Sequence, residues 1–234
     1  MGVHEIQNRL TELGDPGKAA VLQRFFKTGP GEYAEGDLFR GIPVPELRRL
    51  ARNYKDLSLS DAQRLLKSPH HEDRLLALLI LIHIYANRDG AVRERVYRLY
   101  LRNTQFINNW DLVDVSAEHI VGRFLMHRSK EPLTRLANSR LLWERRIAIL
   151  STFHFIKNGL LDETFRIAEI LLGDEEDLIH KAVGWMLREA GKRDLKAEER
   201  FLKAHYRQMP RTMLRYAIER FPEGRRQAYL KGEI

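Results

Sequence analysis

The feature that most constrains this chain is the spacing of its apolar residues. They recur every three or four positions along almost the whole length, as in helices that bury one face. No segment alternates apolar and polar residues between hairpin turns, which argues against strands. Most prolines fall where a helix would begin, namely Pro16, Pro45, Pro69, Pro132, Pro210 and Pro222. The sequence therefore predicts an all-α protein.

Local signals place some of the helix ends. Asn109 is a suitable N-cap for a helix that begins at Trp110, and the segment from Ser60 to Gln63 has the pattern of a capping box. The one long irregular segment is 28–43, which is rich in glycine around Pro30.

The helices also repeat. Equivalent helix positions, about 35 residues apart, are occupied by Ala77, Val113, Ala148 and Ala182. Each step holds two helices, as in 140–157 with 161–172 and 175–190 with 194–208. Such a period indicates an α-solenoid, and the missing TPR signature favours HEAT-like repeats. We expect a single domain, 1–234, that is curved and lines a basic concave DNA-binding face with the first helix of each pair.

Charge points to the partner. Forty Lys and Arg residues against 32 Asp and Glu give a net charge of +8, which favours nucleic acid over an anionic membrane surface. The longest apolar run, 75–82, is well short of the ~20 residues that span a bilayer. The N-terminus has no features of a secretory signal, and the lack of cysteine excludes disulfides, thiolate metal ligands and a cysteine nucleophile. We expect a cytoplasmic protein with no membrane association.

Trp110 and Asp114 are the most informative candidate site residues. They lie at i and i+4 of one predicted helix, so the indole and the carboxylate project from the same face. The equivalent helices of the next two repeats carry Trp143, Arg146, Lys181, Trp185 and Arg188. Aromatic rings, one acid and several cations suit a cationic sugar or base on a phosphate backbone.

Each candidate also has a plain structural reading. A tryptophan on an amphipathic helix is more often a core residue, and we assign Trp143 to the core. Asp111 fits the positive end of the helix dipole, and Asp114 could be a solvated acid. The segment from His70 to Asp73 resembles a metal site in composition, but it lacks the paired histidines of a zinc helix. We expect no metal and no cofactor.

Three motifs together resemble the AlkD-type DNA glycosylases, which are HEAT-like-repeat enzymes of DNA alkylation repair. The motifs agree with the family in order and separation, and no single one is diagnostic. They are Trp110-Asp111-x-Val113-Asp114, then Trp143-x-x-Arg146-x-Ala148-Ile149-Leu150, and Lys181-Ala182-x-Gly184-Trp185-x-Leu187-Arg188-Glu189.

The resemblance implies a monomeric enzyme that removes N3- and N7-alkylated purines from duplex DNA. By this carry-over Asp114 is the catalytic carboxylate, and Trp110 and Trp185 are aromatic walls against the lesion nucleotide. Arg146 is a cation that holds the backbone. Phe25 stands near the DNA where the family has a tyrosine. Further predicted DNA-binding residues are Lys181, Arg188 and Arg48.

The chemistry is consistent with these roles. An N3- or N7-alkylated purine is already cationic, so a carboxylate that stabilises the oxocarbenium-like sugar can suffice. The alternative is a non-catalytic HEAT-like module that binds structured or branched DNA, and Asp114 favours the enzyme. A protein-interaction scaffold is a third reading, which the basic charge disfavours.

Overall fold

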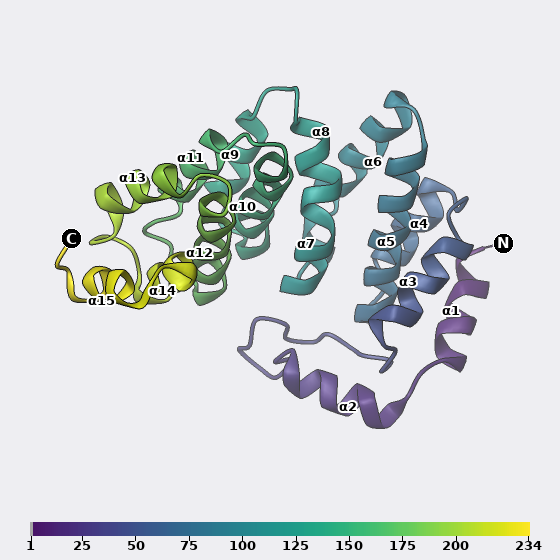
Figure 1. Ribbon diagram of the computed structural model, residues 1–234. Coiled ribbons are helices and arrows are strands. Elements are labelled where there is room, and N and C mark those ends of the chain that lie inside the picture. Colours follow the sequence, from purple (N-terminus) through teal and green to yellow (C-terminus); the bar gives the residue numbers. More distant parts are fainter. Residues whose placement is uncertain (1) are drawn as a thin grey trace. The chain divides into compact units, whose positions relative to one another are not determined.

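The structure, a computed structural model, describes residues 2–234, and helices dominate it (Figure 1). Within these residues the β pairing is a single isolated bridge between Leu38 and His70. The all-α prediction is confirmed. None of the helices in this range is long and apolar enough to cross a membrane. The chain forms two compact units, an N-terminal unit that ends at Ser116 and a C-terminal unit that begins at Ala117.

The N-terminal unit is built around α5. Because α5 is apolar on nearly every side, it packs against α3, α4 and α6 at once (Figure 1). The segment 26–43, which includes the predicted irregular residues 28–43, forms turns without helix after α2 and returns to α3. The helices of this unit are α1 (Val3–Glu12), α2 (Pro16–Phe25), α3 (Val44–Asn53), α4 (Leu59–Leu66), α5 (His71–Asn87), α6 (Gly90–Arg102), the short η1 (Thr104–Phe106) and α7 (Trp110–Ala117).

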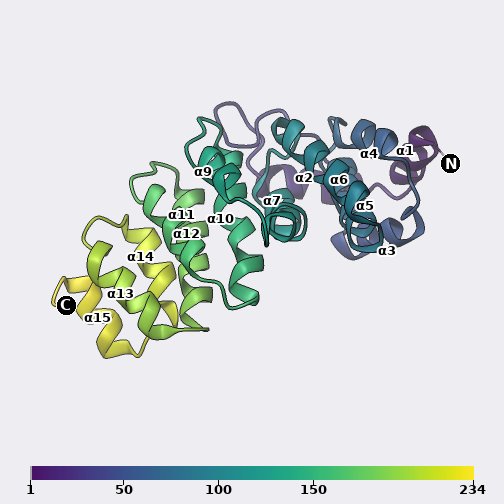
Figure 2. The same cartoon turned by 90° about the horizontal axis from the view of Figure 1, so that it is seen from above.

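The C-terminal unit continues with helices that pack on their neighbours in sequence. Its long members α10 and α12 lie against each other, with α9 and α11 on α10 and with α13 and α14 on α12 (Figure 2). The predicted helix pairs are present within a few residues of their expected ends. The elements are η2 (Glu118–Gly122), α8 (Arg123–Leu125), α9 (Glu131–Ala137), α10 (Leu142–Lys157), α11 (Asp162–Ile170), α12 (Asp177–Gly191), α13 (Leu195–His205), α14 (Arg211–Ala217), η3 (Ile218–Arg220) and α15 (Glu223–Lys231).

One predicted helix start is wrong. The sequence predicts a capping box at Ser60, but α4 begins at Leu59 with Ser58 as its N-cap. The Ser58 backbone is extended, and its hydroxyl accepts the Asp61 N–H at 3.1 Å. The Ser60 hydroxyl lies 2.9 Å from that of Ser58. Two serines are available to cap this helix, and the earlier one satisfies the free amide.

Candidate functional site

Trp110 opens α7 and is half-buried. The side-chain oxygen of Asn109, the residue before the helix, accepts the backbone N–H of Trp110 at 2.8 Å. The indole stacks on Phe26, with ring centroids 5.3 Å apart and planes 18° from parallel. Phe26 in turn stacks on Phe39 at 5.1 Å. The aromatic stack of Trp110, Phe26 and Phe39 fixes the orientation of the indole before any ligand is present.

Asp114 lies one turn after Trp110 on α7 and is half-buried. The hydroxyl of Tyr100, which is fully buried, is 2.9 Å from the Ser116 hydroxyl at the end of the same helix. Burial, and then the charge of Asp114, raise the pKa of Tyr100. Tyr100 therefore stays protonated, and its hydroxyl supports the back of α7 close to the Asp114 carboxylate.

Asp111, which follows Trp110 on α7, is bound to the buried His71. His71 Nε2 lies 2.8 Å from Asp111 Oδ2, while His71 Nδ1 faces Asp37 Oδ2 at 3.6 Å. The Arg74 guanidinium donates to the same Asp37 oxygen at 2.6 Å. The Asp111 side chain thus anchors α7 on α5, in addition to the dipole role that the sequence suggested.

The two acidic residues after His71 hold the 26–43 segment in place. The Glu72 carboxylate accepts the backbone N–H groups of Arg40 at 2.9 Å, Gly41 at 2.7 Å and Ile42 at 3.2 Å. Asp73 binds the Arg40 guanidinium through both oxygens, at 2.6 and 3.1 Å. Their hydrogen bonds therefore position a loop and its aromatic residues.

A cavity of about 320 Å³ lies beside the aromatic stack, within the N-terminal unit. Its walls are mainly apolar, and His71, Glu72 and Asp111 reach it at one side. The apolar walls come from α2, α3 and α5, and from the rings of Phe26 and Phe39. Of the polar groups that border it, the Glu72 carboxylate is bound by backbone amides and the Asp111 carboxylate by His71.

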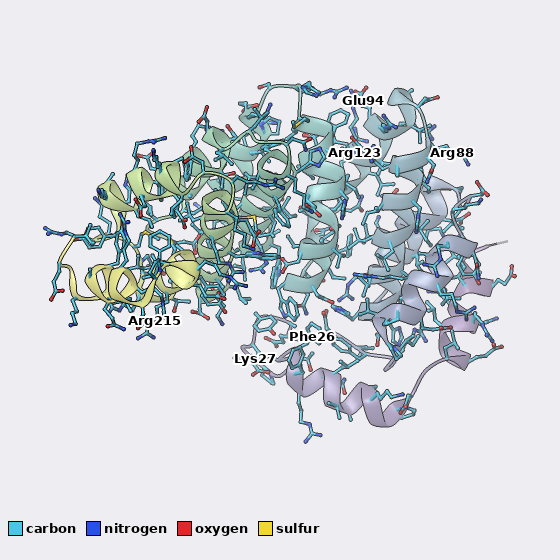
Figure 3. The ribbon with its side chains drawn as sticks, in the orientation of Figure 1. Phe26, Lys27, Arg88, Glu94, Arg123 and Arg215 are labelled. Carbon is cyan, nitrogen blue, oxygen red and sulfur yellow. The ribbon has the colours of Figure 1, made fainter. Side chains whose placement is uncertain are left out.

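Phe25 and Arg48, both predicted to contact DNA, have exposed side chains. Phe25 ends α2, is 62% exposed and meets the edge of Trp110 at 6.3 Å between ring centroids. Its neighbour Phe26, labelled in Figure 3, turns into the protein instead. Arg48 lies on the exposed side of α3. Phe25 is thereby part of the same aromatic group as Trp110.

In the C-terminal unit α10 carries Trp143 and Arg146. Trp143 is buried, as expected for a core residue. Arg146 is only 5% exposed, and its guanidinium donates to the Leu178 carbonyl in the first turn of α12. Arg145 turns elsewhere and binds Asp174 at 2.6 Å. The two adjacent arginines therefore have separate partners.

The other predicted site residues of this unit lie on α12. Trp185 is half-buried, with its indole N–H on Glu189 at 3.2 Å and its ring 5.8 Å from that of Phe153. Lys181 pairs with Asp177 at 2.7 Å. That hydrogen bond raises the pKa of Lys181.

Arg188 is the third cation candidate on this helix, and its guanidinium is engaged by Glu219. Gly184 allows α14 to approach closely, because a Cβ there would collide with the Met213 carbonyl. The close packing of α14 places the following η3, which carries Glu219, beside Arg188.

Sequence reasoning missed Phe26, Phe39, Asp37 and His71. In the sequence the segment 70–73 stands out only as a weak metal motif. Glu72 and Asp73 are consecutive acids in the first turn of a helix, and both are buried. Buried charges need partners inside the protein. Nothing in the local pattern shows that the partners are in segment 26–43.

Comparisons with known proteins agree with the motifs. The family model of the DNA alkylation repair enzyme matches residues 6–221. A solved structure described as a predicted DNA alkylation repair enzyme from Enterococcus faecalis superposes with a TM-score of 0.68 at 17% identity, covering 90% of this chain and 97% of that one. At this identity the likeness concerns the fold. No curated protein matches the sequence significantly. Since the family model spans nearly the whole sequence, the chain belongs to the DNA alkylation repair enzyme family.

Proposed function

We propose that this protein is a DNA glycosylase that hydrolyses the N-glycosidic bond of cationic N3- and N7-alkylated purines in duplex DNA. The observation that carries the proposal is the pairing on α7 of a half-buried carboxylate, Asp114, with an indole, Trp110, that is already held by stacked rings. Membership of the DNA alkylation repair enzyme family supports the substrate class.

The reaction needs little from the protein, because the lesion is already a good leaving group. As the bond between the sugar C1′ and the purine nitrogen breaks, its electron pair returns to the purine, which leaves neutral. The positive charge passes to the sugar, where Asp114 stabilises it, and a water oxygen then bonds to C1′ and releases a proton. A carboxylate about 4 Å from the cation contributes ~4 kcal/mol at an effective dielectric near 20.

The indoles supply a second attraction. A tryptophan face within reach of a cation contributes ~0.5–2 kcal/mol. Trp110 has the fixed orientation that such a face needs, and Trp185 is proposed as the second aromatic wall. These groups favour a charged nucleotide and offer no proton donor for a neutral base.

Binding to the duplex is proposed to rest on phosphate contacts. The net charge of +8 favours a polyanion, and Arg48 and Lys181 are cations whose side chains reach solvent. Arg146 and Arg188 complete the proposed set. A HEAT-like array with a basic concave face, acting as a monomer, is part of the same proposal.

The test is a single-turnover excision assay on duplexes that differ only in one base. We expect release of 7-methylguanine and 3-methyladenine, and no release of the neutral lesions uracil, hypoxanthine and ethenoadenine. Efficient removal of a neutral base would overturn the mechanism. Binding of every duplex without release of any base would favour the non-catalytic DNA-binding module instead.

A further inference from the structure

The protonation of His71 is decided by what surrounds its ring. A neutral imidazole carries one N–H, and the contact of Nε2 with Asp111 Oδ2 at 2.8 Å requires that hydrogen. The Nδ1 lone pair would then face a second carboxylate oxygen, on Asp37, at 3.6 Å. Two acceptors that face each other in a buried site repel. A second proton on His71 gives Nδ1 a hydrogen directed at Asp37 and removes that conflict.

The other charged groups near the His71 ring, Arg74 and Glu72, are bound to partners of their own. Arg74, on the same helix, is bound to Asp37 and partly offsets its charge. Glu72 is directed at the backbone amides of 40–42 and not at His71. From the segment that follows α2, the rings of Phe26 and Phe39 face His71 besides Asp37, at 5.0 and 4.6 Å between centroids. Two aspartates and two aromatic faces therefore favour the imidazolium.

Burial opposes this charge, but Asp111 and Asp37 outweigh it and hold the pKa of His71 above its ordinary value of 6.5. The neighbouring His70 differs, since burial and then Arg40 lower its pKa. The pKa values of these two adjacent histidines are thus shifted in opposite directions from the ordinary value.

The ion network holds both sides of Trp110. Asp111, which follows Trp110, is bound by His71, and Asn108, two residues before Trp110, donates to Asp37 at 3.1 Å. The indole rests on Phe26, and Phe26 and the Phe39 ring stacked behind it both flank His71. Loss of one proton would therefore leave the Asp37 and Asp111 carboxylates without a shared cation and loosen the start of α7.

We propose that His71, as an imidazolium between Asp37 and Asp111, is a positioning residue that fixes Trp110 and Asp114 for catalysis, so that excision declines when His71 loses its proton. This inference rests on the proposed glycosylase function. His71 does not touch the lesion in this scheme; it acts through Asp111 and the aromatic stack.

The catalytic part is tested by the single-turnover rate of 7-methylguanine release between about pH 5 and 9, the range in which histidines titrate. The wild type should lose rate as the pH rises through the His71 pKa, while DNA affinity stays nearly constant. His71→Gln should be about 10- to 100-fold slower at low pH, as expected for a misplaced catalytic group, and should lose the alkaline decline. A His71→Gln profile that keeps the decline would overturn the proposal.

Two matched variants isolate the effect. His70→Gln changes the adjacent histidine and should keep the decline. Glu198→Gln removes a buried acid of the C-terminal unit whose pKa, raised to about 8, lies in the same range. This variant should also keep the decline, and its loss there would assign the pH dependence to Glu198 instead.

Fluorine NMR of protein labelled with fluorotryptophan tests the structural part without any activity. The Trp110 resonance, identified with Trp110→Phe, should shift with the midpoint at which the His71 ring titrates. The Trp143 resonance should not follow that midpoint, and His71→Gln should abolish the shift. A Trp110 resonance that ignores the His71 titration would overturn the positioning role. A wild type that releases no base overturns the proposed function and the catalytic part, and the NMR titration still decides the structural part.

Discussion

Trp110 and Phe26 are stacked, with ring centroids 5.3 Å apart and planes 18° from parallel. They are far apart in sequence, and Phe26 is buried while Trp110 is half-exposed. The contact makes the buried ring the support for the exposed one. Substitutions at Phe26 should therefore lower the excision rate through Trp110, although Phe26 itself is buried.

Phe26→Leu keeps an apolar side chain but removes the flat support. We expect a loss of ~1 kcal/mol in the free energy of unfolding and about a tenfold lower excision rate, because the indole is no longer held. The control is Phe201→Leu, a buried phenylalanine of the C-terminal unit that stacks on Phe165 at 5.4 Å. Urea denaturation and single-turnover rates check both, and equal rate losses would refute a specific role for Phe26.

Asp114→Asn should slow base release by about 100-fold or more, the cost of removing one electrostatic stabiliser, with little change in affinity for DNA. The charge is needed only as the sugar becomes cationic, so the loss belongs to the chemical step. Asp162→Asn, at an exposed acid in the first turn of α11, is the control. Wild-type rates in Asp114→Asn would remove this carboxylate from the mechanism.

Arg146→Ala should reduce excision more than Arg145→Ala, whereas stability should rank them the other way. Arg145→Ala leaves the Asp174 carboxylate, 5% exposed, without its cation, at a cost of ~3 kcal/mol or more. Arg146→Ala loses its hydrogen bond to the Leu178 carbonyl, at a cost of ~1–3 kcal/mol. Chemical denaturation and excision rates are measured on both, and a reversed rate ranking would show that Arg146 is not the site arginine.

Ionisation of Glu198 should lower the stability of the protein as the pH rises from 4.5 to about 8. Burial, and then the charge of Glu199, raise the pKa of Glu198 from 4.5 to about 8. The folded state thus binds the proton more tightly, so stability declines as the pH rises from the unfolded value towards 8 and levels off above it. Glu198→Gln should remove this decline and be more stable than wild type above pH 8, by ~1.4 kcal/mol for every tenfold difference in proton affinity between the folded and unfolded states.

The control for that experiment is Glu175→Gln, at an exposed glutamate of the same unit. Urea denaturation across the pH range gives the free energies. A Glu198→Gln curve parallel to that of wild type would contradict the buried, protonated acid.

Affinity for DNA should depend strongly on salt, with log K falling by ~0.9 for each phosphate neutralised. Lys181→Ala should reduce that slope by ~0.9 if its side chain meets a phosphate. Glu219→Gln should strengthen binding, because it frees the Arg188 guanidinium for a phosphate. Fluorescence anisotropy over a salt series checks each variant. A slope that no cation substitution changes would refute the phosphate contacts.

The sequence by itself determined the helices and the pair of candidate site residues that share one helix, Trp110 and Asp114. Apolar spacing and proline positions depend on neighbours three or four residues away, and so does the shared face of Trp110 and Asp114. These features follow from the order of the amino acids alone. The start of α4 was missed because Ser58 and Ser60 are both good caps, and only the backbone geometry distinguishes them.

What only the tertiary structure decided is the support beneath the site. Phe26 and Phe39 come from a segment without periodicity, and His71 from a different helix, so no local rule brings them to Trp110. The charge of His71 likewise depends on Asp37 and Asp111, whose carboxylates flank the ring only after the chain has folded. Local spacing fixes which face a side chain takes, whereas its partner across the protein is fixed by packing and by the need to pair buried charge.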